Sequence, residues 1–257
     1  MALTKISNTA QIRSNNIKLV KNTLKALPYG TKNTISKLTN LSVATCNTLL
    51  NELAATGEIV EVGTENTPGT TGRPAKTYRF NERFAYILCV YITVQGEHGI
   101  LTYGVLDLLG NIIKSETLNK AVVDYQEIES CIDSVMRNYT QIKAIGFGIP
   151  GVVSDNNVLD VCDIKTLSGC PLGSSLSERF GVDVVIDNDI NLIAYGFYQE
   201  ESPEDESSLA LVSFFENVCA GCGIIINGSI FHGSTNFAGE VSYLPFGLSP
   251  AEQLELL

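Results

Sequence analysis

Apolar residues in the first quarter of the chain recur every three or four positions, the spacing at which side chains share one face of a helix. The pattern predicts three helices, over residues 15–27, 34–38 and 43–56. Asn40 stands between the second and the third, where a left-handed turn residue is needed, and Ser42 is placed to cap the third helix. We therefore expect a helix, a tight turn and an N-capped helix in succession.

The residues after this region predict a pair of strands. Gly57 closes the third helix, and residues 58–62 and 76–80 have the composition and alternation of strands. The loop between them, residues 63–75, contains Gly72-Arg73-Pro74, which presents one Arg from an extended backbone. The arrangement predicts a winged helix-turn-helix domain in residues 1–83, with a plain three-helix bundle as the alternative.

The start of the third helix and the loop are the expected DNA contacts. Short polar and methyl-bearing side chains on that helix can reach base edges in the major groove, and an Arg on the loop suits a narrow minor groove. The predicted DNA-binding residues are Ser42, Val43, Thr45, Cys46, Asn47, Thr48 and Arg73.

Residues 84–257 alternate predicted strands and helices, which is typical of an α/β domain. The expected strands are residues 88–94, 103–107, 112–117, 144–149, 182–186, 209–215, 222–226 and 229–232, and the expected helices are residues 126–139, 174–180 and 189–198. A meander of three strands opens the domain, and a shorter copy follows in residues 209–232. The domain therefore looks duplicated.

Charge divides the chain at the same place. Residues 1–83 carry 11 Lys and Arg against 5 Asp and Glu, a balance of +6, whereas residues 84–257 carry 6 against 23, a balance of −17. This asymmetry suggests that only the first part meets a polyanion, with a solvated surface of uneven charge as the alternative. The 257 residues, 44% of them apolar, contain no run near the roughly 20 apolar residues of a membrane span and no signal peptide. Because the seven cysteines also suit reduced thiols, we expect a cytoplasmic protein without a membrane partner.

Five motifs follow one another along the chain. They are the Gly-Arg-Pro loop, Gly146-Phe147-Gly148-Ile149-Pro150-Gly151, Asp187-Asn188-Asp189-Ile190-Asn191, Gly223-Ile224-Ile225-Ile226-Asn227-Gly228 and Ala238-Gly239-Glu240. In this order they resemble the ROK family of repressors and sugar kinases. The resemblance implies an actin/sugar-kinase-like (ribonuclease H-like) duplicated domain in residues 84–257, with an incomplete second lobe because relatives continue beyond Leu257. It also implies a homodimer, in which two recognition helices read two half-sites.

The family's kinases hold ATP phosphate with an Asp-x-Gly-Gly-Thr loop, whose glycines let backbone N–H groups approach closely. The corresponding residues here are 90–95, in which Tyr91 occupies the Asp position and β-branched residues replace the glycines. The second phosphate loop corresponds to residues 217–223 and lacks its first glycines. We therefore expect no kinase activity and no cofactor.

The sugar-facing motifs are better preserved. The resemblance assigns Gly151, Asn188, Asp189 and Glu240 to sugar binding, with Asp189 at the position of a catalytic base that has no phosphoryl donor here. Taken singly, Asn188 and Asp189 would also suit a helix start, and Glu240 a surface turn.

Metal binding is not expected. Val241-Ser242-Tyr243 replaces the family's x-Gly-His, and the cysteine-rich zinc motif is missing. Cys219 and Cys222 have the spacing of a redox or zinc pair, but we expect buried thiols there, and His98 and His232 are too isolated to support a site.

The sequence therefore predicts a sugar-responsive transcriptional regulator, a repressor of carbohydrate-metabolism genes, whose partners are double-stranded operator DNA and a small carbohydrate. Two alternatives stay open. One is a sugar kinase for a hexose or N-acetylhexosamine with a fused DNA-binding head, and the other is an interaction scaffold without ligand.

Overall fold

The computed structural model describes residues 9–65, 74–95, 98–154, 158–162, 164–201, 208–215, 218–241 and 252. Contacts between residues divide the chain into two units. One consists of Met1–Ala85 with Asp107–Asn111, and the other of Tyr86–Leu106 with Ile112–Leu257. Among the described helices, none is both long and apolar enough to span a membrane.

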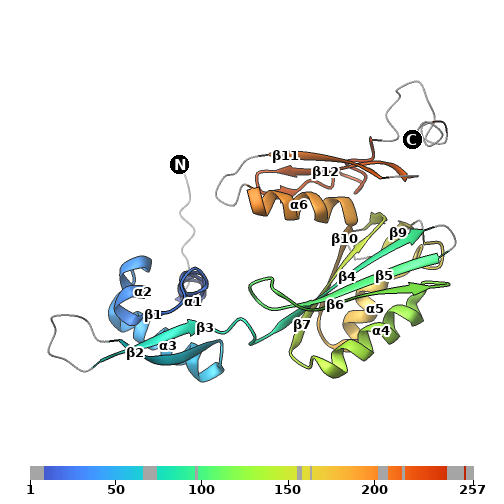
Figure 1. Ribbon diagram of the computed structural model, residues 1–257. Helices are drawn as coiled ribbons and strands as arrows, with labels where there is room; N and C mark the ends of the chain where they lie inside the picture. The colour runs from blue at the N-terminus through green and yellow to red at the C-terminus, as the bar shows by residue number, and fades with distance from the viewer. Residues whose placement is uncertain are drawn as a thin grey trace. The chain divides into compact units, whose positions relative to one another are not determined.

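The first unit combines three helices with a small antiparallel sheet (Figure 1). Its elements are α1 (Thr9–Lys25), β1 (Gly30–Thr31), α2 (Lys32–Thr39), α3 (Val43–Thr56), β2 (Ile59–Glu65) and β3 (Ala75–Phe80). The strand order in the sheet is β1-β3-β2. Along the chain, the hairpin of β2 and β3 follows α3 directly. The three predicted helices are confirmed, although α1 begins six residues before the expected start at residue 15.

Local side-chain chemistry sets the ends of these helices. Asn40 adopts the left-handed conformation, with φ of 56°, and ends α2. Ser42 then caps α3 by accepting a hydrogen bond from the backbone N–H of Thr45 at 3.0 Å, and Gly57, with φ of 85°, ends it. The apolar faces meet in a core that includes Leu24, Ile35, Leu50 and Ile59, all nearly fully buried.

A five-stranded mixed sheet organises the second unit (Figure 1). It has the order β10-β7-β4-β5-β6 and consists of β4 (Tyr86–Gln95), β5 (His98–Leu106), β6 (Ile112–Lys120), β7 (Ile142–Ile149) and β10 (Asp183–Asn188). The strands β4, β7 and β10 are parallel, and the meander β4-β5-β6 is antiparallel. Helices α4 (Tyr125–Asn138) and α5 (Leu172–Phe180) cover one face, where Leu88, Ile145 and Phe147 lie in the core.

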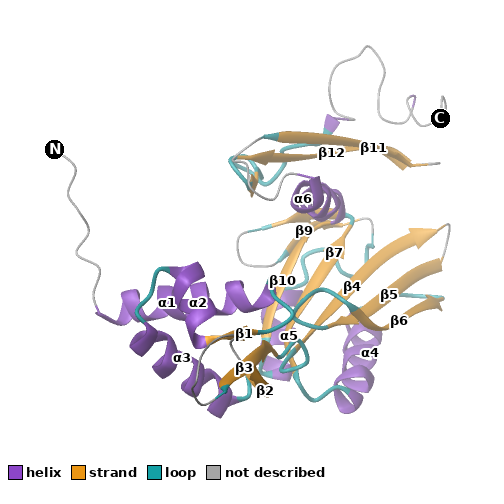
Figure 2. Ribbon diagram, turned by 60° about the vertical axis from the view of Figure 1, so that its left-hand side comes forward, coloured by secondary structure: helices purple, strands orange, loops and turns teal. Residues whose placement is uncertain are grey.

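A second antiparallel meander, β11 (Leu209–Phe215), β12 (Val218–Ile226) and β13 (Ser229–Ile230), packs against α6 (Asp189–Glu201) (Figure 2). The helix approaches the strand closely because β12 carries glycines at the contact: a Cβ at Gly223 would lie 2.7 Å from the carbonyl oxygen of Ile190. The tight turn at Asn227 and Gly228, both with positive φ, reverses the chain between β12 and β13.

Two features of the fold differ from the sequence-based expectation. A hairpin of β8 (Gly151–Val153) and β9 (Leu159–Cys162), which the pattern did not predict, follows β7. The turn Asp107–Asn111, which joins β5 to β6, belongs to the first unit, and Leu108 packs against its core. Residues 217 and 242–251 lie outside the described part of the chain.

Gly239 should be the least replaceable glycine in the second unit. It has φ of +92°, and a Cβ there would overlap the carbonyl oxygen of Cys222. Gly239→Ala should lower the free energy of unfolding by at least about 2 kcal/mol, the sum of a left-handed strain near 1 kcal/mol and a steric overlap. The control is Gly181→Ala, which has φ of +66° and open space around the Cβ, so it should lose only about 1 kcal/mol. Equal losses in urea denaturation would contradict the assigned overlap.

Candidate functional site

The candidate site is built where strand β10 ends and helix α6 begins. Asn188 is the last residue of β10, and its side-chain oxygen accepts hydrogen bonds from the backbone N–H groups of Ile190 at 2.9 Å and Asn191 at 3.2 Å. The amide therefore caps the helix. Because the carboxyl ends of parallel strands lie at one edge of the sheet, residues that follow β7 reach the same place.

Gly151 is brought to Asn188 in this way. The side-chain nitrogen of Asn188 donates to the carbonyl oxygen of Gly151 at 3.0 Å. Gly151 has φ of 143°, a conformation that L side chains rarely adopt. Among the contacts of the described residues, the Asn188 amide thus uses both acceptor positions of its oxygen and one of its two N–H groups. It serves as the helix cap considered above and keeps one donor for a ligand.

Asp187 and His232 form a pair that sequence reasoning missed. His232 Nε2 lies 2.9 Å from Asp187 Oδ2, while Asp187 Oδ1 accepts from the backbone N–H of Asn188 at 2.7 Å and from the side chain of Asn191 at 3.2 Å. The Asp187 side chain is 14% exposed and that of His232 40%. The partners stand 45 residues apart, so no local pattern could have linked them.

The loop that carries Glu240 is tied to the same place through His232. The backbone N–H of Ala238 donates to the carbonyl oxygen of His232 at 3.1 Å, and the carbonyl oxygen of Gly239 accepts from the N–H of Cys222 at 3.0 Å. Glu240 itself is half-buried and directly follows this anchored glycine. The structure thus joins the loop of Glu240 to β12, and through His232 to the junction of β10 and α6.

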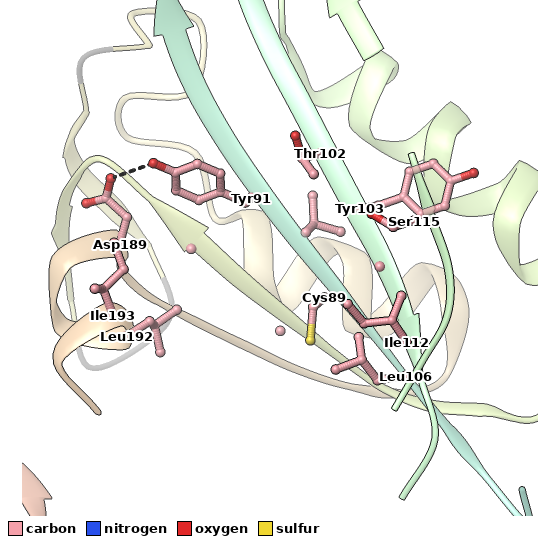
Figure 3. A pocket seen from close by; sticks show the side chains of 14 residues that line it. Cys89, Tyr91, Thr102, Tyr103, Leu106, Ile112, Ser115, Asp189, Leu192 and Ile193 are labelled. Carbon is pink, nitrogen blue, oxygen red and sulfur yellow. Dashed lines mark hydrogen bonds between the residues drawn. The ribbon is translucent and has the colours of Figure 1, made fainter. Parts of the chain in front are cut away.

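Tyr91 reaches the remaining predicted sugar-binding residue, Asp189. Its hydroxyl donates to Asp189 Oδ2 at 3.4 Å, a contact drawn in Figure 3. Burial raises the pKa of the Tyr91 hydroxyl, and the charge of Asp189 and this hydrogen bond raise it further. The phenol therefore stays protonated and able to donate at neutral pH.

A cavity of about 500 Å³ opens beside this pair on the sheet face opposite α4 and α5. Small residues, among them Cys89, Gly146 and Gly148, line it. Tyr91 and Asp189, which also line it, point toward one another (Figure 3). Leu192 and Ile193 of α6 also line it. Apart from Asp189, its lining carries no charged group.

The predicted DNA-binding residues lie at the start of α3. Ser42, Val43, Asn47 and Thr48 are exposed, and Thr45 is half-buried. The expectation that Cys46 is exposed was wrong: its side chain is fully buried in the core of the first unit, 3.9 Å from the hydroxyl of Thr39. Arg73 lies outside the described residues.

The cysteines that raised a metal or redox question are partly described. Cys222 is buried, and burial raises the pKa of its thiol, while the side chain of Cys219 lies outside the description. Cys162 is also buried, with its thiol donating to the carbonyl oxygen of Pro150. Within the described ranges, no group of three or more His, Cys, Asp or Glu side chains is arranged to hold a metal ion.

Comparison with known proteins places these observations in a family. The model of the ROK family matches residues 96–250. The xylose repressor of Caldicellulosiruptor bescii is 29% identical over 220 residues, covering 81% of this chain and 53% of the repressor. The N-acetyl-D-glucosamine kinase of Haemophilus influenzae is 26% identical over 135 residues, covering 51% of this chain and 44% of the kinase. The chain thus spans about half the length of these curated relatives.

A solved structure extends the likeness to the fold. A ROK family transcriptional regulator, homologous to the E. coli MLC protein, aligns with a TM-score of 0.66 and 19% identity over 91% of this chain and 60% of the regulator. At that identity the match shows the fold alone. The second unit therefore has the α/β fold of sugar-kinase-like ROK proteins.

The pair of Asp187 and His232 predicts a graded response to substitution. His232→Ala should lower the free energy of unfolding by about 1 kcal/mol, because Asp187 loses one hydrogen-bond partner while partial exposure screens the loss. His232→Gln places an amide nitrogen near the position of Nε2 and should retain most of that stability, whereas His232→Asn is too short and should behave like Ala. If all three variants unfold at the same urea concentration, the contact contributes no stability.

Proposed function

We propose that this chain, which belongs to the ROK family, is a cytoplasmic transcriptional repressor that binds operator DNA through its first unit and a sugar through its second. The observation that carries the proposal is the exposed polar start of α3 on a basic unit, in the same chain as a sugar-kinase-like domain. The named relatives that match most of the chain are xylose repressors, which makes D-xylose the first effector to test.

The first unit supports DNA binding through a winged helix-turn-helix. Asn40 turns the chain between α2 and α3, and Ser42 fixes where α3 begins. Asn47 and Thr48 project from the first turns of α3, where a recognition helix contacts bases. The hairpin of β2 and β3 supplies the wing, and we propose that Arg73 on its loop contacts the minor groove.

The second unit supports recognition of a polyol. Carboxylates at Asp189 and Glu240 can accept hydrogen bonds from sugar hydroxyls, and the remaining N–H of Asn188 can donate one. Gly151 keeps the backbone close to the Asn188 amide. We propose that two copies of the chain form a homodimer, since one recognition helix reads too few base pairs for a specific operator.

The similarity to N-acetyl-D-glucosamine kinases makes sugar phosphorylation the second candidate function. Retention of Asp189 at the position of the family's base favours it. Two features oppose it. By the family resemblance, Tyr91 occupies the position of the phosphate-loop Asp. In the structure, β4 continues as a strand paired with β5 as far as Gln95, where a kinase needs a glycine loop. A carboxylate without a site for the phosphoryl donor cannot transfer phosphate.

DNA recognition by α3 can be tested with a duplex selected from a random pool by the wild-type chain. Replacing Thr45 and Asn47 by Ala should weaken binding to that duplex by at least about tenfold, because each removes a polar group at the groove-facing helix start. The control, Asn22→Ala with Thr23→Ala, removes the same two residue types from α1 and should bind as the wild type does. Retention of the same footprint by the Thr45 and Asn47 variant would show that α3 does not enter the groove.

The kinase alternative makes the opposite forecast for turnover. We expect no ATP-dependent phosphorylation of D-xylose, D-glucose or N-acetyl-D-glucosamine, measured as ADP release. Tyr91→Asp should not restore it, since β-branched Thr93 and Val94 remain in the paired strand. Turnover above the enzyme-free blank that Asp189→Asn abolishes would establish a kinase instead.

A further inference from the structure

Positive charge is missing from a long stretch of the second unit. Residues 180–257 contain twelve Asp and Glu, one His and no Lys or Arg. This stretch includes β10 with Asn188, α6 with Asp189, the second meander, and the segment after β13 with Glu240. The one imidazole in it, His232, is already paired with Asp187.

The cations that the second unit does possess lie elsewhere. Ion pairs engage Lys114 with Glu116 on β6, Lys120 with Glu127 of α4, and Arg179 of α5 with Glu129 of α4. Arg137 pairs with Asp133 within α4. The other two are Lys143, at the start of β7, and Lys165, in the segment that precedes α5.

Tyr91 also disfavours binding of an anion at this end of β4. Its hydroxyl donates a hydrogen bond to Asp189, and the residue, which is 38% exposed, lines the cavity next to that carboxylate. Beyond Tyr91 the backbone of β4 is committed to pairing with β5: Thr93 faces Ile100, and Val94 faces Gly99. The N–H groups that point toward β5 are engaged in this ladder, and the β-branched side chains of Thr93 and Val94 hinder the close approach to a phosphate that glycines allow.

We propose that Tyr91 is a specificity-determining residue of the effector site, and that the site accepts an uncharged sugar and rejects the phosphate ester of the same sugar. The inference rests on the proposed sugar-binding function. A phosphate ester carries nearly two negative charges at neutral pH, and beside Asp187, Asp189 and Glu240 it would meet like charges without a compensating cation. A neutral sugar loses nothing by this and gains a hydroxyl partner from the phenol of Tyr91, alongside Asp189.

The regulator would accordingly sense a sugar before phosphorylation. A sugar kinase step that phosphorylates the effector would yield a product that the site excludes. This order of events follows from the charge of the site and from the contact of Tyr91, and it does not depend on which neutral sugar binds.

Isothermal titration of the full chain tests the proposal with matched probes. These are D-xylose and D-xylose 5-phosphate, D-glucose and D-glucose 6-phosphate, and N-acetyl-D-glucosamine and its 6-phosphate. We expect at least one neutral sugar to bind and its ester to bind roughly 100-fold more weakly at low salt, with a smaller ratio in 0.5 M NaCl because salt screens the repulsion. An ester that binds within threefold of its parent sugar overturns the proposal, and loss of that binding in Lys165→Ala would identify the cation responsible.

Substitution of Tyr91 separates its role in specificity from one in stability. Tyr91→Phe removes only the hydroxyl and should raise the Kd of the neutral sugar by about three- to tenfold, the effect of one lost hydrogen bond, with an unchanged melting temperature. Tyr195→Phe removes the hydroxyl of a similarly exposed tyrosine, which lies on α6 outside the cavity lining, and should leave the Kd unchanged. Wild-type affinity in Tyr91→Phe would overturn the assignment of Tyr91. If none of the six probes binds while DNA binding persists, the sugar-sensing part of the proposed function fails, and this inference fails with it.

Discussion

The hydrogen bonding at the end of β10 is the constraint on which the rest of the second unit depends. The half-buried end of β10 and the first turn of α6 leave backbone N–H groups that need acceptors, and Asp187 and Asn188 supply them. The same two side chains hold His232 and the carbonyl of Gly151, so the helix start, the loop after β7 and the loop after β13 are fixed together. The side chains that satisfy the backbone at the start of α6 thereby also belong to the candidate sugar site.

Close approach of backbone to backbone is the second requirement. The helix α6 lies on β12 because Gly221 and Gly223 offer no Cβ at the contact, and the loop before Glu240 reaches β12 because Gly239 does not. These glycines belong to motifs that also suit a phosphate-binding sugar kinase. Their packing role gives the fold a reason to keep these glycines whether or not ATP is bound.

The two units also differ in charge and in the polar groups that they present. A basic first unit presents a polar helix start, while the candidate sugar site in the second combines carboxylates with one paired imidazole, that of His232. For the proposed repressor this division would be an advantage, because an acidic unit is repelled from the DNA backbone and would leave binding to α3 and the proposed wing. In the proposed sugar site, the hydroxyl of Tyr91 adds a group that can face a neutral ligand beside Asp189.

Local chemistry in the sequence by itself determined the helices and most of the strands. Asn40, Ser42 and Gly57 mark their helix ends because left-handed turns and N-caps depend only on the residue and its neighbours. Packing decided what local pattern could not. Cys46 is buried because the unit's other helices cover its face of α3, and the turn Asp107–Asn111 joins the first unit through Leu108 rather than the domain in which its strands lie. The pairs of His232 with Asp187 and of Tyr91 with Asp189 span 45 and 98 residues. Contacts of that separation arise only when strand order and register bring distant segments to one sheet edge, and no periodicity along the chain encodes them.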